Sequence, residues 1–540
     1  MEKFENDSIF NSDIGNTSYE TNNASLKEGK FERNSVFRNS FNKFNIKTFK
    51  FSGKKNSDLL AGGIPLGRIN SIQTLVDNSD AHTLVMGATG SKKSRLVIMP
   101  SVYVMGSAGE SMIISDPKAE IYGRTSAYLK KNGYNLVVVN LRNPDTGHAW
   151  NPLAIPYSFY KKGDIDRAYE FANDVAFNLT QAEKDLSDPF WDNSAGDLFF
   201  GLVALLFKYN LENNLPDEYV NLYNLIRLRR YLFQNVEHSE VNDVYLKNLI
   251  NNDEIIMGSL SGTITALERT KTSILSTFDE KMRCFILQPN LLNMLSNNDI
   301  DLKNCGKKFA IFLIMPDEKT TYHKLISLFI KQSYEYLIYE AQTTRNGRLP
   351  IRVNYILDEF SSLPTIKDFP SMISAARSRD IRFVLVIQSK HQLVERYREE
   401  SETISSNCIN WIFLTSRELP LLKELSALCG KNKSGRDILS VSSLQHLNKE
   451  KGQALILSGR LLPYIAELID ISEYDQDKYA MLQLRITKRG KYLLQDFKKI
   501  EEDLIKYDRL SLQNRVSDNE IYREKELEKK FDELFGPLED

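Results

Sequence analysis

Cysteine and net charge are both scarce in this chain of 540 residues. Its four cysteines lie at positions 284, 305, 408 and 429 without any Cys-x-x-Cys spacing, so a disulfide scaffold is excluded and a zinc site is not expected. So few cysteines, without a disulfide pattern, indicate a protein of a reducing compartment. Lys and Arg number 70 against 71 Asp and Glu, which gives a formal net charge of −1. The balance excludes a protein that coats nucleic acid by bulk charge, and it confines any contact with DNA to a local surface.

Long apolar runs are also missing. The longest, residues 199–207, is about half as long as a helix that crosses a bilayer. The N-terminus opens with Glu2, Glu5 and Asp7 and has no basic region leading into an apolar one, so no secretory signal is expected. These absences predict a chain that has no transmembrane segment and stays in the cytoplasm.

The chain is long enough for two or three domains, and its hydrophobic content of 42% supports a real core. Residues 1–55 are predicted to form a disordered polar arm that is acidic at first and basic over 24–50. In the basic part Phe37, Phe41 and Phe44 follow helical spacing. They either form a short amphipathic helix on an anionic surface or a partner, or belong to a linker whose aromatic side chains cover the folded domain, which is the favoured interpretation.

Short apolar runs separated by helical stretches predict an α/β fold with a mostly parallel sheet. Residues 155–285 instead show long helical periodicities, which predict an all-alpha domain inserted into the sheet domain. The sheet domain is therefore assigned to residues 56–154 and 286–475, and residues 476–540 to a charged helical tail. The strand-like runs lie at 83–86, 112–114, 136–139, 309–315, 353–357, 383–387 and 411–415.

A glycine-rich segment follows the first of these runs and precedes a helical stretch, as a phosphate-binding loop does. Lys93 stands where an ammonium reaches the β- and γ-phosphates, and Ser94 where a hydroxyl holds Mg²⁺. Lys92 replaces the expected glycine. If the backbone there is left-handed, its Cβ costs about 1–2 kcal/mol, and its ammonium either adds attraction for the anion or distorts the loop. The full segment is Gly87, Ala88, Thr89, Gly90, Ser91, Lys92, Lys93 and Ser94.

Polar residues end two further apolar runs. Asp358 and Glu359 follow residues 353–357, where one acid would hold Mg²⁺ and the next would polarise the attacking water. Gln388 follows residues 383–387 and would sense the γ-phosphate or orient water. Arg377 lies between the two runs and is either an arginine that reaches a neighbouring subunit's phosphate or a surface residue paired with an acid. Because ligands gather at the carboxyl ends of such strands, the three motifs together predict a nucleotide site.

Several motifs in order make the sequence resemble the type IV secretion coupling proteins, the conjugative DNA-transfer ATPases of the TraG/VirD type. The resemblance runs from about residue 60 to 475. It implies a RecA-like P-loop NTPase domain interrupted by an all-alpha domain. The motifs are Gly87-Ala88-Thr89-Gly90-Ser91, Ser115-Asp116-Pro117-Lys118-Ala119-Glu120, Asn151-Pro152-Leu153, Pro189-Phe190-Trp191, Leu357-Asp358-Glu359-Phe360 and Gln388-Ser389.

The resemblance also implies a role and partners. Such proteins form a ring, usually hexameric, on the cytoplasmic face of the cell membrane, hydrolyse ATP with Mg²⁺, and pass relaxase-bound single-stranded DNA to the secretion channel. The expected alternatives are a nucleotide-binding receptor or scaffold with weak or no turnover, and a segregation-type DNA translocase. The family usually begins with transmembrane helices, which this sequence lacks. Anchoring is therefore expected from a partner, from the basic arm at 31–51, or from an upstream segment.

Residue roles carry over by position. Lys93 and Ser94 match the Walker A pair, Asp358 and Glu359 the Walker B pair, and Gln388 the third motif. By its distance from Asp358, Arg377 matches the arginine finger. A structural or coupling role is expected for residues 116–118, and Trp191 is expected in the core of the helical domain. The change at Lys92 puts the rate of hydrolysis in question more than nucleotide binding.

Overall fold

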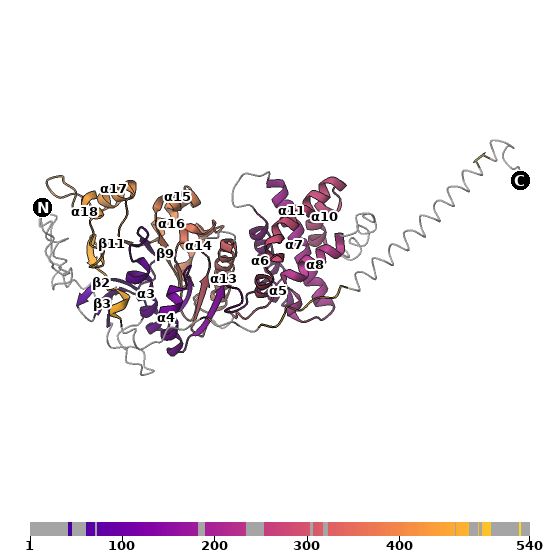
Figure 1. Ribbon diagram of the computed structural model, residues 1–540, viewed down its shortest axis with the longest axis horizontal. Helices are drawn as coiled ribbons and strands as arrows, with labels where there is room; N and C mark the ends of the chain where they lie inside the picture. Colours follow the sequence, from indigo (N-terminus) through magenta and orange to yellow (C-terminus); the bar gives the residue numbers. More distant parts are fainter. Residues whose placement is uncertain are drawn as a thin grey trace. The chain divides into compact units, whose positions relative to one another are not determined.

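The computed structural model describes residues 41–45, 61–70, 73–181, 189–233, 253–302, 306–316, 322–459, 461–474, 484, 489–497 and 529–530. They divide into two compact units (Figure 1). The sheet unit comprises Met1–His148 and Asp299–Lys488, and the helical unit comprises Ala149–Asn298 and Arg489–Asp540. The expected insertion at 155–285 falls inside the first segment of this helical unit, which also includes residues 149–154 and 286–298.

The sheet unit is built on a nine-stranded sheet with the order β12-β11-β10-β4-β9-β8-β5-β7-β6 in the described residues. Neighbouring strands from β10 to β6 in this order are parallel, whereas β11 and β12 are added antiparallel. The strands are β4 (Thr83–Met86), β5 (Ser111–Ser115), β6 (Asn135–Asn140), β7 (Phe309–Ile314), β8 (Val353–Leu357), β9 (Ile381–Ile387), β10 (Asn410–Phe413), β11 (Gln453–Ser458) and β12 (Tyr464–Glu467).

The strands at the centre of the sheet are apolar along their whole length because helices cover both faces. Every residue of β4, β5, β7, β8 and β9 is buried. The helices of this unit, several of which are labelled in Figure 1, are α3 (Met99–Ala108), α4 (Glu120–Lys131), α13 (His323–Thr343), α14 (Phe369–Ala376), α15 (Lys390–Tyr397), α16 (Glu400–Asn407), α17 (Leu419–Leu428) and α18 (Val441–Gln445).

A second, three-stranded sheet has the order β1-β3-β2, with β1 (Phe41–Asn45) antiparallel to β3 (Gln73–Asp77), which also pairs with β2 (Ile64–Asn70). The expectation of a disordered arm over 1–55 is therefore wrong at 41–45, and so is the helical alternative for the same stretch. The strand depends on β3 for its main-chain hydrogen bonds, and that partner is not visible in the local spacing of the aromatic residues. The rest of the arm lies outside the described residues.

The helical unit is organised around α7 (Pro189–Glu212), which is apolar on all sides and contacts α5, α6, α8, α10 and α11. Trp191, expected in the core, is only partly buried at the start of α7, where its ring meets that of Phe190 edge-on. The other helices are α5 (Ala154–Lys161), α6 (Ile165–Thr180), α8 (Leu222–Phe233), α10 (Glu254–Ile264), α11 (Glu268–Ile286) and α12 (Pro289–Leu295).

A non-helical segment, residues 491–497, lies along the helical unit, and we call it the C-terminal strap. The amide of Asn224 donates to the Leu493 carbonyl at 3.0 Å and accepts from the Gln495 N–H at 2.9 Å. Phe497 is fully buried between Tyr209 and Tyr231. The tail at 476–540 was expected to be helical. In the strap that expectation is wrong, because side chains of the helical unit take up main-chain groups that a helix would satisfy internally.

No helix within the described ranges is both long and apolar enough to span a membrane.

Candidate functional site

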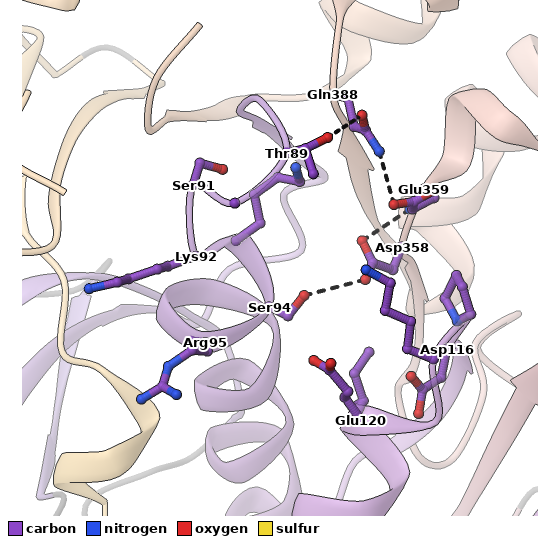
Figure 2. A pocket seen from close by; sticks show the side chains of 15 residues that line it. Thr89, Ser91, Lys92, Ser94, Arg95, Asp116, Glu120, Asp358, Glu359 and Gln388 are labelled. Carbon is purple, nitrogen blue, oxygen red and sulfur yellow. Dashed lines mark hydrogen bonds between the residues drawn. The ribbon is translucent and has the colours of Figure 1, made fainter. Parts of the chain in front are cut away.

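The carboxyl ends of β4, β9 and β8 meet because these strands are neighbours in the sheet, with Met86 beside Ile387 and Leu385 beside Leu357. A pocket of about 260 Å³ lies just beyond them (Figure 2). The structure thus brings together the glycine-rich loop, the acid pair and Gln388, as the sequence predicted. The pocket is lined by Thr89, Gly90, Ser91, Lys92, Lys93, Ser94, Arg95, Asp116, Pro117, Lys118, Glu120, Ile121, Asp358, Glu359 and Gln388.

Main-chain hydrogen bonds fix the start of the glycine-rich loop. The Gly87 N–H donates to Ile387 at 3.2 Å and the Ala88 N–H to Thr415 at 2.8 Å. A Cβ on Gly87 would lie 2.6 Å from the Ser91 hydroxyl, so a larger residue here would force the Ser91 side chain to move. The loop continues through a π-helical turn, Ser94–Ile98, into α3. Main-chain N–H groups at such a helix start are suited to bind an anion.

Lys92 adopts the left-handed conformation that the sequence analysis considered, with φ +66°. Its ammonium does not join the pocket's polar groups: it pairs with Glu450 at 2.8 Å, and Figure 2 shows the side chain directed away from Asp358 and Gln388. The hydrogen bond from Lys92 holds the pKa of the Glu450 carboxyl below its ordinary value. The substitution for glycine therefore strains the backbone, and it places the additional charge on the outer side of the loop.

Lys93 is the buried cation of the loop. Its ammonium donates to the carbonyls of Gly87 at 2.5 Å and Ala88 at 3.3 Å. Burial lowers its pKa, and the carboxylates of Asp358 and Glu359 oppose that shift. The ammonium thus lies against the main chain of the loop, and its positive charge partly neutralises the negative charges of Asp358 and Glu359.

Asp358 lies 3.5 Å from the Ser94 hydroxyl, measured from its Oδ2 atom. Burial, followed by repulsion from Glu359, raises the pKa of the Asp358 carboxyl to about 7, and Lys93 counteracts the increase. A buried carboxyl with a raised pKa takes up a proton readily unless a nearby cation neutralises its negative charge. The hydroxyl and carboxyl oxygens are of the type that Mg²⁺ prefers.

Glu359 and Gln388 are linked to the loop by a chain of hydrogen bonds. The Gln388 amide donates to Glu359 Oε1 at 2.9 Å and accepts from the Thr89 hydroxyl at 2.9 Å (Figure 2). Glu359 itself has a left-handed backbone, with φ +54°. Its carboxylate is therefore held by Gln388 and connected through Gln388 to the glycine-rich loop.

The wall of the pocket opposite the loop was not predicted as part of the site. It comes from Asp116, Pro117, Lys118 and Glu120, which follow β5. Asp116 accepts from the Tyr122 N–H at 2.7 Å, and burial raises its pKa to about 6. The sequence does show a charged segment directly after a strand. It does not show the strand order, in which β5 lies beside β8 and so brings this segment to the pocket.

Arg377 does not reach the pocket of its own chain. It pairs with Asp80 at 2.9 Å, and both side chains are 40% exposed. Within this chain Arg377 is thus a surface residue paired with an acid, which is one of the two interpretations of its sequence position. The nearby Arg382 is instead fully buried, where it donates to Glu110 at 3.0 Å and to Asn354 at 2.8 Å. Any contact of Arg377 with a nucleotide would therefore require the pocket of another copy of the chain.

The chain is similar in sequence to known coupling and conjugal transfer proteins. The chain is 21% identical over 386 residues to the type IV secretion system-coupling protein VirD4 of Bartonella quintana (strain Toulouse), covering 70% of this chain and 56% of that protein. It is 21% identical over 352 residues to the conjugal transfer protein TraG of Escherichia coli, covering 61% and 52%. The chain thus spans somewhat more than half the length of these relatives.

Solved structures of the plasmid coupling protein TrwB share the fold. The complex with the GTP analogue GDPNP matches with a TM-score of 0.53 and 15% identity, covering 75% of this chain and 89% of that one. The complex with ADP and Mg²⁺ matches with a TM-score of 0.51 and 14% identity, covering 77% and 89%. The chain therefore has a RecA-like fold with an all-alpha insertion, as the sequence predicted.

The family described as type IV secretory system conjugative DNA transfer matches residues 30–463. This match covers the glycine-rich loop, the acid pair, Gln388 and the whole helical insertion, and so includes most of the chain. The chain belongs to the type IV secretory system conjugative DNA transfer family.

Proposed function

We propose that this protein is an ATP-hydrolysing coupling protein that delivers relaxase-bound single-stranded DNA to a type IV secretion channel. One observation carries the proposal: Lys93, Ser94, Asp358, Glu359 and Gln388 converge on a single pocket although they come from separate segments of the chain. Membership of the conjugative DNA transfer family supplies the wider role.

The loop supplies donors for the phosphates of a nucleotide. Lys93 provides an ammonium, and the start of the helix after the loop provides main-chain N–H groups. The Ser91 hydroxyl is buried and, within the described part of the chain, has no hydrogen-bond partner. A buried hydroxyl in this state is stabilised when an acceptor such as a phosphate oxygen reaches it. The pocket thus offers donors for the phosphates of a nucleotide, for which we propose ATP; the related coupling protein TrwB has been solved with a GTP analogue and with ADP and Mg²⁺.

Ser94 and Asp358 are the residues that would hold Mg²⁺. Within the described residues no cluster of three or more His, Cys, Asp or Glu side chains can hold a metal ion. A site with few protein ligands suits Mg²⁺, because this ion usually keeps several waters and takes further oxygens from the substrate. The bound ion would neutralise negative charge on the phosphates.

Glu359 is proposed as the residue that polarises the attacking water, and Gln388 as the sensor of the γ-phosphate. The carboxylate of Glu359 borders the pocket and is held by the Gln388 amide, which itself borders the pocket. An amide can donate to one group and accept from another at the same time, so Gln388 can respond to a change in either neighbour.

Arg377 is proposed as an arginine finger that acts on a neighbouring copy. Its position outside its own pocket and its 40% exposure agree with that role, although the pair with Asp80 must open. This proposal includes a ring of identical subunits, expected to be a hexamer, at the cytoplasmic face of the membrane. A partner or the basic arm at 31–51 would hold the ring there, and the relaxase and the channel proteins would be its other partners.

DNA-stimulated ATP hydrolysis tests the proposal. Lys93→Ala should lose nucleotide binding together with hydrolysis. Glu359→Gln should keep binding but lose about 10²–10⁴-fold in turnover, since only the contribution of the base is removed. Lys423→Ala, an exposed lysine of α17 outside the pocket, is the matched control and should behave as the wild type. Equal and negligible rates in all the proteins would contradict the motor. If they still bound nucleotide, a receptor with little turnover would remain, consistent with the strained backbone at Lys92.

A further inference from the structure

The hydrogen bonds among Thr89, Gln388 and Glu359 have only one consistent set of donors and acceptors. An ionised carboxylate accepts hydrogen bonds and cannot donate them, so the NH₂ group of Gln388 must face Glu359. The two atoms lie 2.9 Å apart. The oxygen of the same amide then faces Thr89, also at 2.9 Å, and only the hydroxyl can supply the proton between them. The carboxylate therefore determines the orientation of the whole chain of three groups.

Each of the three groups belongs to a different element. Thr89 lies in the glycine-rich loop, Gln388 directly follows β9, and Glu359 directly follows β8. The chain of hydrogen bonds is thus a connection between the phosphate loop and the acid pair. It runs in addition to the direct but longer contact between Ser94 and Asp358, at 3.5 Å.

We propose that Thr89 is a positioning residue: its hydroxyl holds the Gln388 amide in the orientation that keeps Glu359 in place. The proposal rests on the proposed function, because it assigns Glu359 a role in hydrolysis. It deepens that function by making the geometry of the water-polarising carboxylate depend on the conformation of the phosphate loop. Thr89 would carry out no chemical step itself.

Loss of the hydroxyl should release the amide. Without Thr89 as donor, the Gln388 oxygen keeps no partner on the loop, so the Gln388 side chain is free to swing away and its hydrogen bond to Glu359 is made for less of the time. Thr89 is exposed and Gln388 and Glu359 are half-buried, so water can replace part of the lost contact. The expected effect on turnover is therefore moderate, about fivefold to tenfold, as for the loss of one hydrogen bond.

Steady-state kinetics of four proteins test whether Thr89 acts through Gln388. The proteins are the wild type, Thr89→Val, Gln388→Ala and the double variant. Thr89→Val preserves the shape of the side chain but removes the donor. We expect kcat to fall about fivefold to tenfold while KM and the affinity for ADP with Mg²⁺ change by less than about twofold. If Thr89 acts only through Gln388, the double variant should be no slower than Gln388→Ala. Independent, additive losses would overturn the proposal, and so would a Thr89→Val enzyme with the wild-type kcat.

Two further variants exclude a merely structural effect. Thr89→Ser restores the hydroxyl and should recover most of the lost rate. Thr365→Val removes an exposed threonine hydroxyl that donates to the Arg396 carbonyl outside the pocket, and it should leave the kinetics unchanged. Failure of serine to rescue, despite normal nucleotide affinity, would show that the threonine methyl group rather than the hydroxyl matters.

Hydrogen exchange provides a readout that does not depend on turnover. In the nucleotide-free full-length chain, the turn after β8 is held at Glu359, whose carbonyl accepts from the Ser362 N–H at 2.8 Å. Exchange across residues 359–363 should become about threefold to tenfold faster in Thr89→Val and return in Thr89→Ser. Unchanged exchange would overturn the positioning role. If the Thr89 variants show these changes in exchange but the wild-type protein hydrolyses no ATP, the proposed function is refuted and the connection through Thr89 remains.

Discussion

The strained backbone at Lys92 allows a quantitative test of the phosphate loop. Lys92 has φ +66°, a conformation that costs an L-residue about 1–2 kcal/mol. Glycine would remove this strain but would give the unfolded chain about 0.5–1 kcal/mol of additional conformational entropy. Lys92→Ala and Lys92→Gly lose the same ion pair with Glu450, so the difference between them contains only the strain and the opposing entropy of glycine. Lys92→Gly should therefore be more stable than Lys92→Ala by about 0.5–1 kcal/mol.

The reverse substitution lies two residues away. Gly90 has φ +76°, and a Cβ added there would meet no atom within 4 Å. Gly90→Ala should therefore impose strain without a steric clash, and should destabilise the sheet unit by about the same 0.5–1 kcal/mol.

Hydrogen exchange of amides in the buried strands β8 and β9 gives the free energy of opening of the sheet unit. Because these strands belong to the sheet unit alone, unfolding of the helical unit does not contribute to the measured value. Glu450→Gln serves as the control for the ion pair, because it leaves the backbone at Lys92 unchanged. Equal opening free energies for Lys92→Ala and Lys92→Gly would refute the reasoning. So would a stabilising effect of Gly90→Ala.

Three other expectations follow from burial and charge. Arg382→Ala should destabilise the sheet unit by about 3–5 kcal/mol, because it leaves Glu110 buried without its closest cation. Arg377→Ala removes an exposed pair and should cost less than about 1 kcal/mol. Denaturant unfolding of the two variants measures both free energies. Burial raises the pKa of Asp358 to about 7, so binding of ADP with Mg²⁺ near neutral pH should release protons and should tighten as the pH rises through 7. Calorimetry in two buffers of different ionisation enthalpy measures the release, which Asp358→Asn should abolish. Phe497→Ala should detach the C-terminal strap, since truncating a buried Phe costs about 3–5 kcal/mol, and faster exchange across 491–497 would report it.

The central strands could be predicted from sequence because they are buried on both faces. Each then reads as a short, continuous apolar run, as at β8 and β9, and the chemistry-bearing residues follow the run directly. The phosphate loop, the acid pair and Gln388 were found in this way.

Features that depend on distant partners could not be predicted. Strand β1 needs β3, and the C-terminal strap needs side chains of α8. The ion pair of Lys92 with Glu450 joins residues 358 positions apart, and the hydrogen bond of Thr89 with Gln388 spans 299. Local spacing contains no information on such pairs. The same limit applies to the wall formed after β5, whose place in the site depends on the strand order alone.

The strand order also has a consequence for synthesis of the chain. In the described sheet β4 pairs with β9 and β10, β5 with β7 and β8, and β6 with β7, so none of the first three strands pairs with another of them. The first ladder requires β7, which ends at Ile314, whereas β6 ends at Asn140. At about 5–20 residues per second, β6 waits roughly 9–35 seconds for β7, and β5 and β4 wait longer for their first partners, while the helical unit is made. The nascent chain is therefore expected to depend on chaperones during that interval, and the phosphate loop gains its flanking strands only after the ribosome has passed residue 413.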